Sequence, residues 1–208
     1  DTINYNYSKQ SINSINYQKL KEKDVIILDE VIKISSGLSD ILMKCVTNGV
    51  TLIIIPSNNI DLDNINKFFN LIGVDNLGKK INSKFSVKDI IKDHPIFKNV
   101  FEGEIENIDY PIVKNYYSSI KSIKSNKKPI YVLENNEIFL SNYSNKKSNI
   151  YVFNTSLNDS SSNFHKHALF VPTFLNMANN SLVSSNIYNV IKNDDFFISI
   201  PNNNEIFN

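Results

Sequence analysis

Apolar residues in the first third of the chain alternate between continuous runs and helical stripes. Residues 24–28 form a short run bounded by polar residues, which is typical of a strand buried on both faces. An N-cap serine, Ser36, then precedes an apolar stripe at helical spacing over 38–46, and Gly49 stands where a left-handed C-terminal cap is needed. A second apolar run follows at 50–55. This order predicts two parallel strands joined by a right-handed helical crossover.

The following segments first predict another helix and then a series of strands. Asp61 is the expected N-cap of a second helix that ends at Gly73. From Pro129 the pattern becomes strand-like, with a two-residue hairpin turn expected at 135–136 and a looser one at 144–147. The three strands predicted there cover residues 130–133, 137–140 and 150–153.

The two ends of the sequence are less regular. Residues 1–18 are polar with scattered Ile and Tyr, and we interpret them as a loose or edge segment. A last helix is expected over about 163–180, with Pro172 either bending it or delaying its start. We assign residues 1–186 to one α/β domain, and 187–208 to a strand-like tail whose alternation would also suit the start of a following β module.

Together these elements predict an α/β fold with a parallel-rich sheet, helices on both faces and an antiparallel extension. The hydrophobic fraction of 41% is enough for a sizeable core. No apolar run reaches the roughly 18–20 residues that span a bilayer. Any signal or membrane anchor is therefore expected outside the given sequence.

Charge and cysteine content exclude several classes of function. The net charge is +1, and all basic residues are lysines, so bidentate reading of phosphate by arginine is absent and nucleic-acid binding is not expected. A small basic cluster is best explained as a solvated loop; it comprises Lys121, Lys124, Lys127 and Lys128. The single cysteine, Cys45, excludes an internal disulfide, and its place on a helical apolar stripe predicts a small buried hydrophobe.

Candidate chemistry is sparse. Ser57 follows the second buried strand, at the edge where open α/β folds bind ligands, but no glycine flanks it as a nucleophile elbow requires. The histidines are His94, His165 and His167. The last two could share a metal from a strand, with a carboxylate from Asp93, Glu102 or Asp159, yet no metal-binding motif is present. We expect neither a metal nor a cofactor.

Three stretches, taken in order, resemble the membrane-anchored, BatA-like aerotolerance proteins of Bacteroidetes-type bacteria. They are residues 24–28 with 36–49, the run His94-Pro95-Ile96-Phe97 with 100–101, and residues 154–157 with 162–172. The resemblance implies a domain similar to class I glutamine amidotransferases in fold, periplasmic and held at the inner membrane by helices elsewhere in the chain. It also implies a link to stress or aerotolerance, and von Willebrand A-type proteins as partners.

The chain departs from the amidotransferase pattern at the positions where that family carries its catalytic residues. No cysteine or flanking glycine occurs near Pro56 or Ser57, and the strand over 150–153 leads into Asn154 instead of a histidine. We therefore expect the fold to be kept and the amidotransferase chemistry to be lost. The first strand of the BatA-like pattern is expected to be absent or to lie within residues 1–17.

Three functions remain in competition. The preferred one is a non-catalytic interaction or scaffold domain with an exposed apolar patch that includes Phe97, Phe101 or Tyr110. The second is a hydrolase that pairs Ser57 with His165 or His167. The third is small-ligand sensing in a crevice at the strand ends, near residues 57–59 and 154–158. The candidate pseudo-active-site edge consists of Ser57, Asn58, Asn59, Asn154, His165 and His167.

Overall fold

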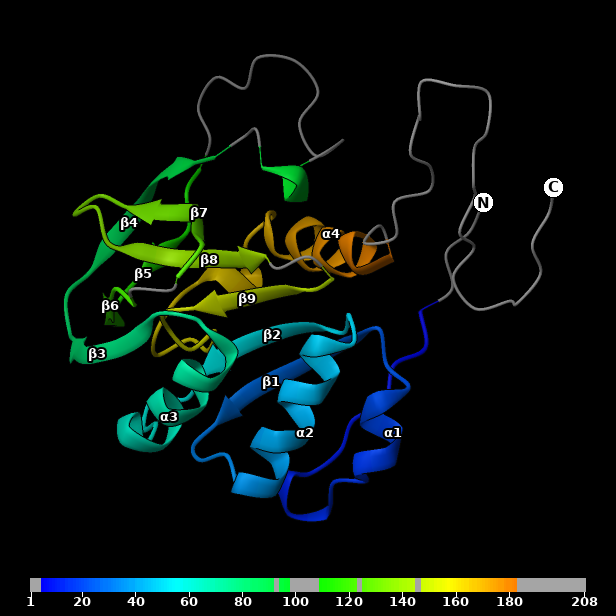
Figure 1. Cartoon of the computed structure of the whole chain (residues 1–208). Coiled ribbons are helices and arrows are strands. Elements are labelled where there is room, and N and C mark those ends of the chain that lie inside the picture. Colours follow the sequence, from blue (N-terminus) through cyan, green and yellow to red (C-terminus); the bar gives the residue numbers. More distant parts are fainter. Residues whose placement is uncertain (1–4, 92–93, 98–108, 123–124, 145–146, 183–208) are drawn as a thin grey trace, which may run out of the picture.

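The computed structural model describes residues 5–91, 94–97, 109–122, 125–144 and 147–182 (Figure 1). The predicted tail over 187–208 lies outside the described residues. So do Asp93, Phe101, Glu102 and Lys124.

A seven-stranded mixed sheet organises the molecule, in the order β1-β2-β9-β8-β7-β4-β5. Its parallel part is β1-β2-β9, and the pairs from β9 to β5 are antiparallel. A two-stranded antiparallel ribbon, β3-β6, is separate from it. The strands are β1 (Val25–Val31), β2 (Thr51–Pro56), β3 (Asn76–Ile81), β4 (Phe85–Ile90), β5 (Ile112–Val113), β6 (Tyr116–Ile120), β7 (Lys127–Leu133), β8 (Ile138–Ser144) and β9 (Asn149–Phe153).

The predicted strand–helix–strand unit is confirmed. Between the parallel strands β1 and β2 lies α2 (Ser36–Thr47), whose N-cap is Ser35, one residue earlier than predicted. Its end is a Schellman motif, because Val50 N–H donates to the Cys45 carbonyl and Gly49 N–H to the Val46 carbonyl. Gly49 has φ 103°, a conformation that disfavours any residue with a Cβ.

The second predicted helix, α3 (Leu62–Ile72), is confirmed at both ends. Asp61 caps it by accepting from Asn64 N–H, and Gly73 ends it in the left-handed conformation. The Asn64 side chain also binds both the N–H and the carbonyl of Ile34, so α3 is fixed to the loop that enters α2.

Antiparallel pairing is more extensive than the prediction of a parallel-rich sheet. Two of the six pairings in the seven-stranded sheet are parallel among the described residues. The difference comes from residues 76–120, where β3, β4, β5 and β6 lie in sequence that was not assigned to elements. Their alternation is irregular, with a register shift in β3–β6 and another in β4–β7.

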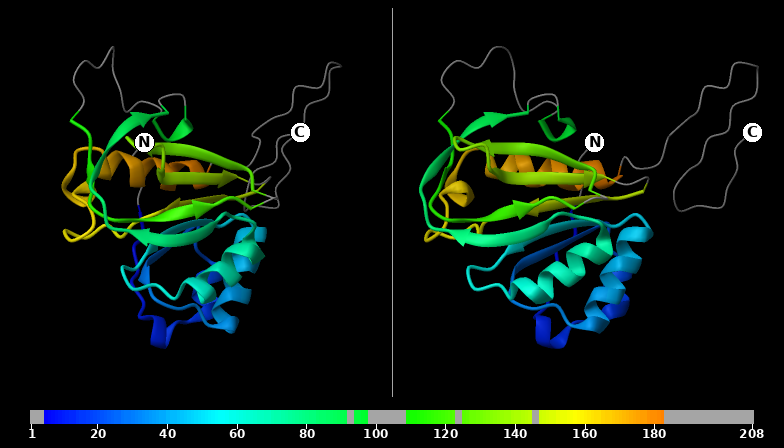
Figure 2. Two further views of the ribbon diagram at one scale, coloured as in Figure 1. Left: turned by 90° about the vertical axis from the view of Figure 1, so that its left-hand side faces the viewer. Right: turned by 60° about the vertical axis from the view of Figure 1, so that its left-hand side comes forward.

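Helices cover both faces of the sheet, as predicted, and two cores result (Figure 2). On one face, α2 and α3 pack on the even-numbered residues of the parallel strands, such as Leu52 and Val152. On the other face, α4 (Phe170–Leu182) packs on the odd-numbered ones, such as Ile53 and Phe153. Cys45 is buried in the first core, as predicted, and burial raises the pKa of its thiol.

The first strand is not buried on both faces as predicted. Ile27 is 45% exposed, because β1 is an edge strand among the described residues and α4 does not cover it. No strand occurs in the described part of residues 1–17. That segment instead holds a 3-10 turn, Ile12–Ser14, and leads into α1 (Tyr17–Lys21), which contacts α2.

The predicted last helix is divided in two. A 3-10 turn, η3 (Phe164–Lys166), precedes α4, and Pro172 lies in the first turn of α4. A proline is tolerated there because the first-turn N–H groups have no partner inside the helix. The proline therefore marks a delayed helix start, one of the two outcomes predicted for it.

Candidate functional site

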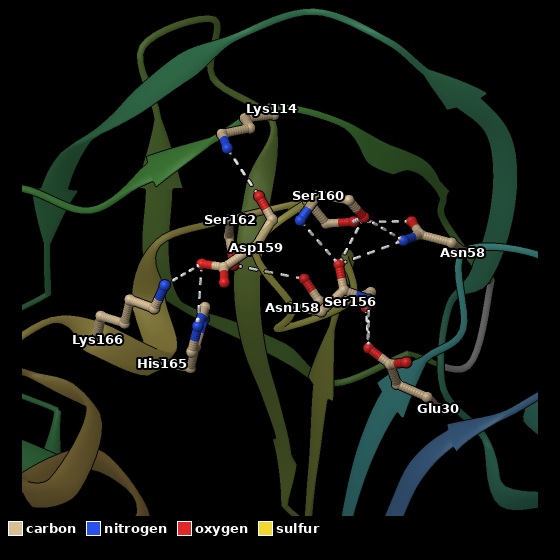
Figure 3. Close-up of polar contacts among 11 residues, drawn as sticks. Glu30, Asn58, Lys114, Ser156, Asn158, Asp159, Ser160, Ser162, His165 and Lys166 are labelled. Atoms are coloured by element: carbon tan, nitrogen blue, oxygen red, sulfur yellow. Dashed lines mark hydrogen bonds and ion pairs between the residues drawn. The ribbon is translucent and has the colours of Figure 1, made fainter.

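The carboxyl ends of the parallel strands bring together side chains from three distant segments of the chain. Glu30 comes from the end of β1, Asn58 follows β2, and residues 156–161 follow β9 (Figure 3). This is the strand edge at which open α/β sheets place their ligand sites. This edge is therefore the candidate functional site.

Glu30 occupies an uncommon backbone conformation, with φ 50°. The register of β1 on β2 shifts between Asp29 and Val31, so Glu30 is the extra residue of a β-bulge. Its carboxylate accepts hydrogen bonds from Ser156 Oγ and, at 2.8 Å, from Asn158 Nδ2. The bulge thus directs a charged group across β2 to the loop that follows β9.

Asn58 is the centre of a second set of contacts. Its side-chain amide donates to Ser160 Oγ at 3.0 Å, and its side-chain oxygen accepts from Ser161 Oγ at 2.8 Å. Lys80 on β3 donates to the same oxygen at 2.9 Å. The candidate residue Asn58 therefore joins three segments of the fold, and both ends of its amide are used.

Ser57 does not form a nucleophile elbow. Its Oγ accepts from Asn59 N–H at 3.3 Å and so stabilises a local turn. Its carbonyl accepts from the Tyr117 hydroxyl at 2.8 Å, and burial raises the pKa of that phenol. Asn59 itself is exposed.

Neither candidate histidine contacts Ser57. His165 Nε2 lies 3.3 Å from Asp159 Oδ1, and Lys166 binds the same carboxylate and lowers the pKa of Asp159. His167 Nε2 lies 2.6 Å from the Asp109 carbonyl oxygen. The contact that a Ser57 hydrolase requires therefore does not occur among the described residues.

Asn154 lies at the carboxyl edge of the parallel strands, but its hydrogen bonds stabilise the fold. It is 4% exposed, its backbone carbonyl accepts from Tyr117 N–H at 2.7 Å, and its amide donates to the Tyr117 carbonyl at 3.2 Å. These bonds attach β6 to the end of β9. Of the candidate residues, the structure links Asn58 to the loop after β9, and it gives Ser57, Asn154, His165 and His167 partners that do not bring them together with one another.

Four residues of this network were not predicted, namely Glu30, Lys80, Ser160 and Ser161, whereas Ser156 and Asn158 lie within the stretch 154–158 that the ligand-sensing hypothesis named. Glu30 could have been noticed as an acidic residue just beyond an apolar strand run. Ser160 and Ser161 lay in a polar stretch without a distinguishing spacing. Lys80 is on a strand that the pattern did not show.

Metal ligation finds no support in the described residues, which contain no group of three or more His, Cys, Asp or Glu side chains arranged to hold an ion. An open depression occurs on α2, where Asp40, Met43, Lys44, Thr47 and Asn48 line it. Since α2 ends just before β2 begins, this depression lies toward the amino ends of the parallel strands, whereas Glu30 lies at their carboxyl ends.

The Glu30 contacts lead to a prediction about stability. We expect Glu30→Ala to lower the free energy of unfolding by about 1.5–3 kcal/mol, because hydrogen bonds to a charged group contribute that much. Alanine shares the left-handed backbone cost of glutamate, so the loss isolates the carboxylate. Urea denaturation measures it, with Glu22→Ala, an exposed glutamate, as the control. Equal stability of the two variants would show that the link across β2 contributes nothing.

The fold places this chain among mixed α/β proteins. No protein-family model and no curated protein matches the sequence. Among solved structures, it is similar to the cytoplasmic protein STM3548 from Salmonella typhimurium, with 15% identity, 79% of this chain and 74% of that chain covered, and a TM-score of 0.60.

Two further structures have the same fold. The cytoplasmic protein STM1381 from Salmonella typhimurium LT2 is 10% identical over 79% of this chain and 74% of its own, with a TM-score of 0.61. The mmIFT52 N-terminal domain is 11% identical over 85% of this chain and 84% of its own, with a TM-score of 0.58. At these identities the likeness concerns the fold alone. Among the described residues, no helix is both long and apolar enough to cross a membrane.

Proposed function

We propose that this chain is a non-catalytic protein-interaction domain that binds its partner through the outer face of α4. The observation that carries the proposal is the character of that helix. Its 13 residues include no charged side chain, and Val171 and Leu175, one turn apart, are 59% and 43% exposed. An exposed apolar strip on an uncharged helix is typical of a surface that another protein covers.

The strand edge supports the non-catalytic part of the proposal. At the place where an amidotransferase-like fold would present its nucleophile, Ser57 Oγ caps a local turn. The carboxylate of Glu30 and the side-chain amide of Asn58 form hydrogen bonds with the loop after β9. A working site would need such groups to face a substrate.

The location of the apolar surface differs from the one expected from the sequence. Phe97 is 5% exposed and belongs to the core, so it is excluded from a binding patch. Tyr110 is half-buried and packs against the same core. The exposed apolar strip on α4 takes their place in the proposal.

The finer assignments rest on the resemblance to BatA-like proteins. We propose that the fold is a class I glutamine amidotransferase-like one, that the domain lies outside the inner membrane of a membrane-anchored bacterial protein, and that its partner is a von Willebrand A-type membrane protein. The unit formed by the parallel strands β1 and β2 with α2 between them supports this proposal.

A charge-insertion experiment tests the proposal. Val171→Asp combined with Leu175→Asp should abolish co-purification of the full-length protein with von Willebrand A-type proteins of the same membrane. Binding would then require two unpaired carboxylates to be buried in an apolar interface, which is energetically costly. Because both positions are exposed, thermal stability should change little.

The matched control places aspartate at Leu71, which is also 43% exposed but lies on α3. It should leave co-purification intact. If the α4 double variant binds as well as the wild type, or if Leu71→Asp is equally damaging, α4 is not the binding face.

A further inference from the structure

His94 is a buried histidine with an unusual set of neighbours. It is 7% exposed, and it immediately precedes the 3-10 turn η2 (Pro95–Phe97). Its Nδ1 lies 3.2 Å from the Ile96 N–H, which donates to it. Its Nε2 lies 3.4 Å from the side-chain amide of Asn142 on β8.

These contacts require a neutral imidazole. A backbone N–H cannot turn away, so Nδ1 must keep its lone pair and the ring proton must be on Nε2. The Asn142 amide nitrogen, which lies nearest to Nε2, also donates to Asn149 Oδ1 at 3.3 Å, and a flip of this amide would place its unpartnered oxygen against the Nε2 proton. A second proton on Nδ1 would face the Ile96 N–H directly, and the two donors would repel.

The charges around the His94 ring also favour the neutral imidazole. Burial, reinforced by the positive charge of Lys128 on β7, lowers the pKa of His94 from 6.5 to about 4. Among the described residues, η2 and α4 carry no charge, and the side chain on β8 that contacts the ring is the neutral Asn142. No carboxylate in the described structure is placed to accept the proton.

The turn that His94 caps is a fixed contact between the sheet and α4. Ile96 is fully buried, its carbonyl accepts from Asn176 on α4 at 2.6 Å, and the Phe97 ring packs edge-on against Tyr131 of β7 at 5.6 Å. We propose that His94 is a proton-operated latch, whose protonation detaches η2 from α4 and the sheet while the rest of the domain stays folded. This inference is independent of the partner proposed for α4.

The sign of the effect follows from the two protonation states. The detached turn exposes His94 and gives it an ordinary pKa near 6.5, so detachment takes up a proton. The docked turn is therefore fully favoured above pH 6.5 and is lost as the pH falls toward 4. Between pH 7 and pH 5 the opening constant should rise about 20-fold.

Native-state hydrogen exchange by NMR tests the latch. Protection factors of the Ile96 and Phe97 amides, corrected for intrinsic rates, should be lower than that of Ile53 in β2, and should fall about 20-fold from pH 7 to pH 5. His94→Asn keeps an oxygen that can accept from Ile96 N–H but does not titrate, so this pH dependence should disappear.

His167 provides the matched control. Its Nδ1 accepts from Leu169 N–H at 3.2 Å in the same local geometry, but its Nε2 faces the Asp109 carbonyl oxygen. His167→Asn should retain the full pH dependence at η2. If Ile96 and Phe97 are protected as strongly as Ile53 at both pH values, η2 opens only by global unfolding and the latch is refuted. The wild-type comparison decides this even if His94→Asn does not fold.

Discussion

Replacing Lys127 with methionine should destabilise the domain by about 3–5 kcal/mol, since removing one partner of a buried ion pair leaves the other charge uncompensated. Lys127 Nζ lies 2.6 Å from Asp75 Oδ2, and the Asp75 side chain is 1% exposed. Burial by itself raises the pKa of Asp75, but hydrogen bonds from Lys127 and the Ser122 N–H outweigh it and lower the pKa. Without Lys127, the buried Asp75 side chain loses the strongest of the interactions that lower its pKa, so burying either its charged or its protonated form costs folding free energy.

Chemical denaturation of the single and double variants measures this effect. Lys128→Met, at the exposed neighbouring position, should change stability by less than about 0.5 kcal/mol. Adding Asp75→Asn to Lys127→Met should restore part of the loss, because the buried charge is then removed. Additive losses in the double variant would argue against a coupled ion pair.

Phe164→Ala should cost about 3–5 kcal/mol, the usual loss when a fully buried phenylalanine is truncated. Phe164 is 0% exposed at the start of η3. Its ring lies 5.2 Å from Phe139, 5.6 Å from Tyr131 and 5.8 Å from Phe153, and it also meets Phe170 of α4. One side chain thus joins β7, β8, β9 and α4.

Thermal unfolding followed by circular dichroism reports this loss, and Tyr7→Ala, at a position 83% exposed, is the control. Phe164→Leu should recover most of the stability, since it refills much of the cavity. Because Phe164 anchors the end of the loop after β9, Phe164→Ala should also weaken the Glu30 and Asn58 contacts. A loss below about 1 kcal/mol would mean that the core collapses around the missing ring.

The parallel half of the fold was predictable because its signals are local. The cap of α3 by Asp61 and the glycine ends of both helices were all read correctly, since each depends on a few neighbouring residues. The hairpin near 135–136 was also found, with Asn136 left-handed at φ 68°. The N-cap of α2 was misplaced by one residue, within the uncertainty of a Ser-Ser pair.

Longer-range features were not predictable from the pattern. A continuous apolar run looks the same in a central strand and in an edge strand, so the exposure of Ile27 could not be anticipated. Lys127 was assigned to a solvated loop because its buried partner, Asp75, is 52 residues away in sequence. The Glu30 site likewise depends on strands β1 and β9, whose order in the sheet no local motif encodes.

We propose that α4, and not the carboxyl edge of the parallel strands, is the surface through which this chain functions. The most direct test places a photo-crosslinking amino acid at position 171 and, separately, at position 59 of the full-length protein in its own membrane. We expect position 171 to give a discrete adduct with a partner protein and position 59, which is also exposed, to give none. An adduct at position 59 without one at 171, or no adduct at either position, would contradict the account.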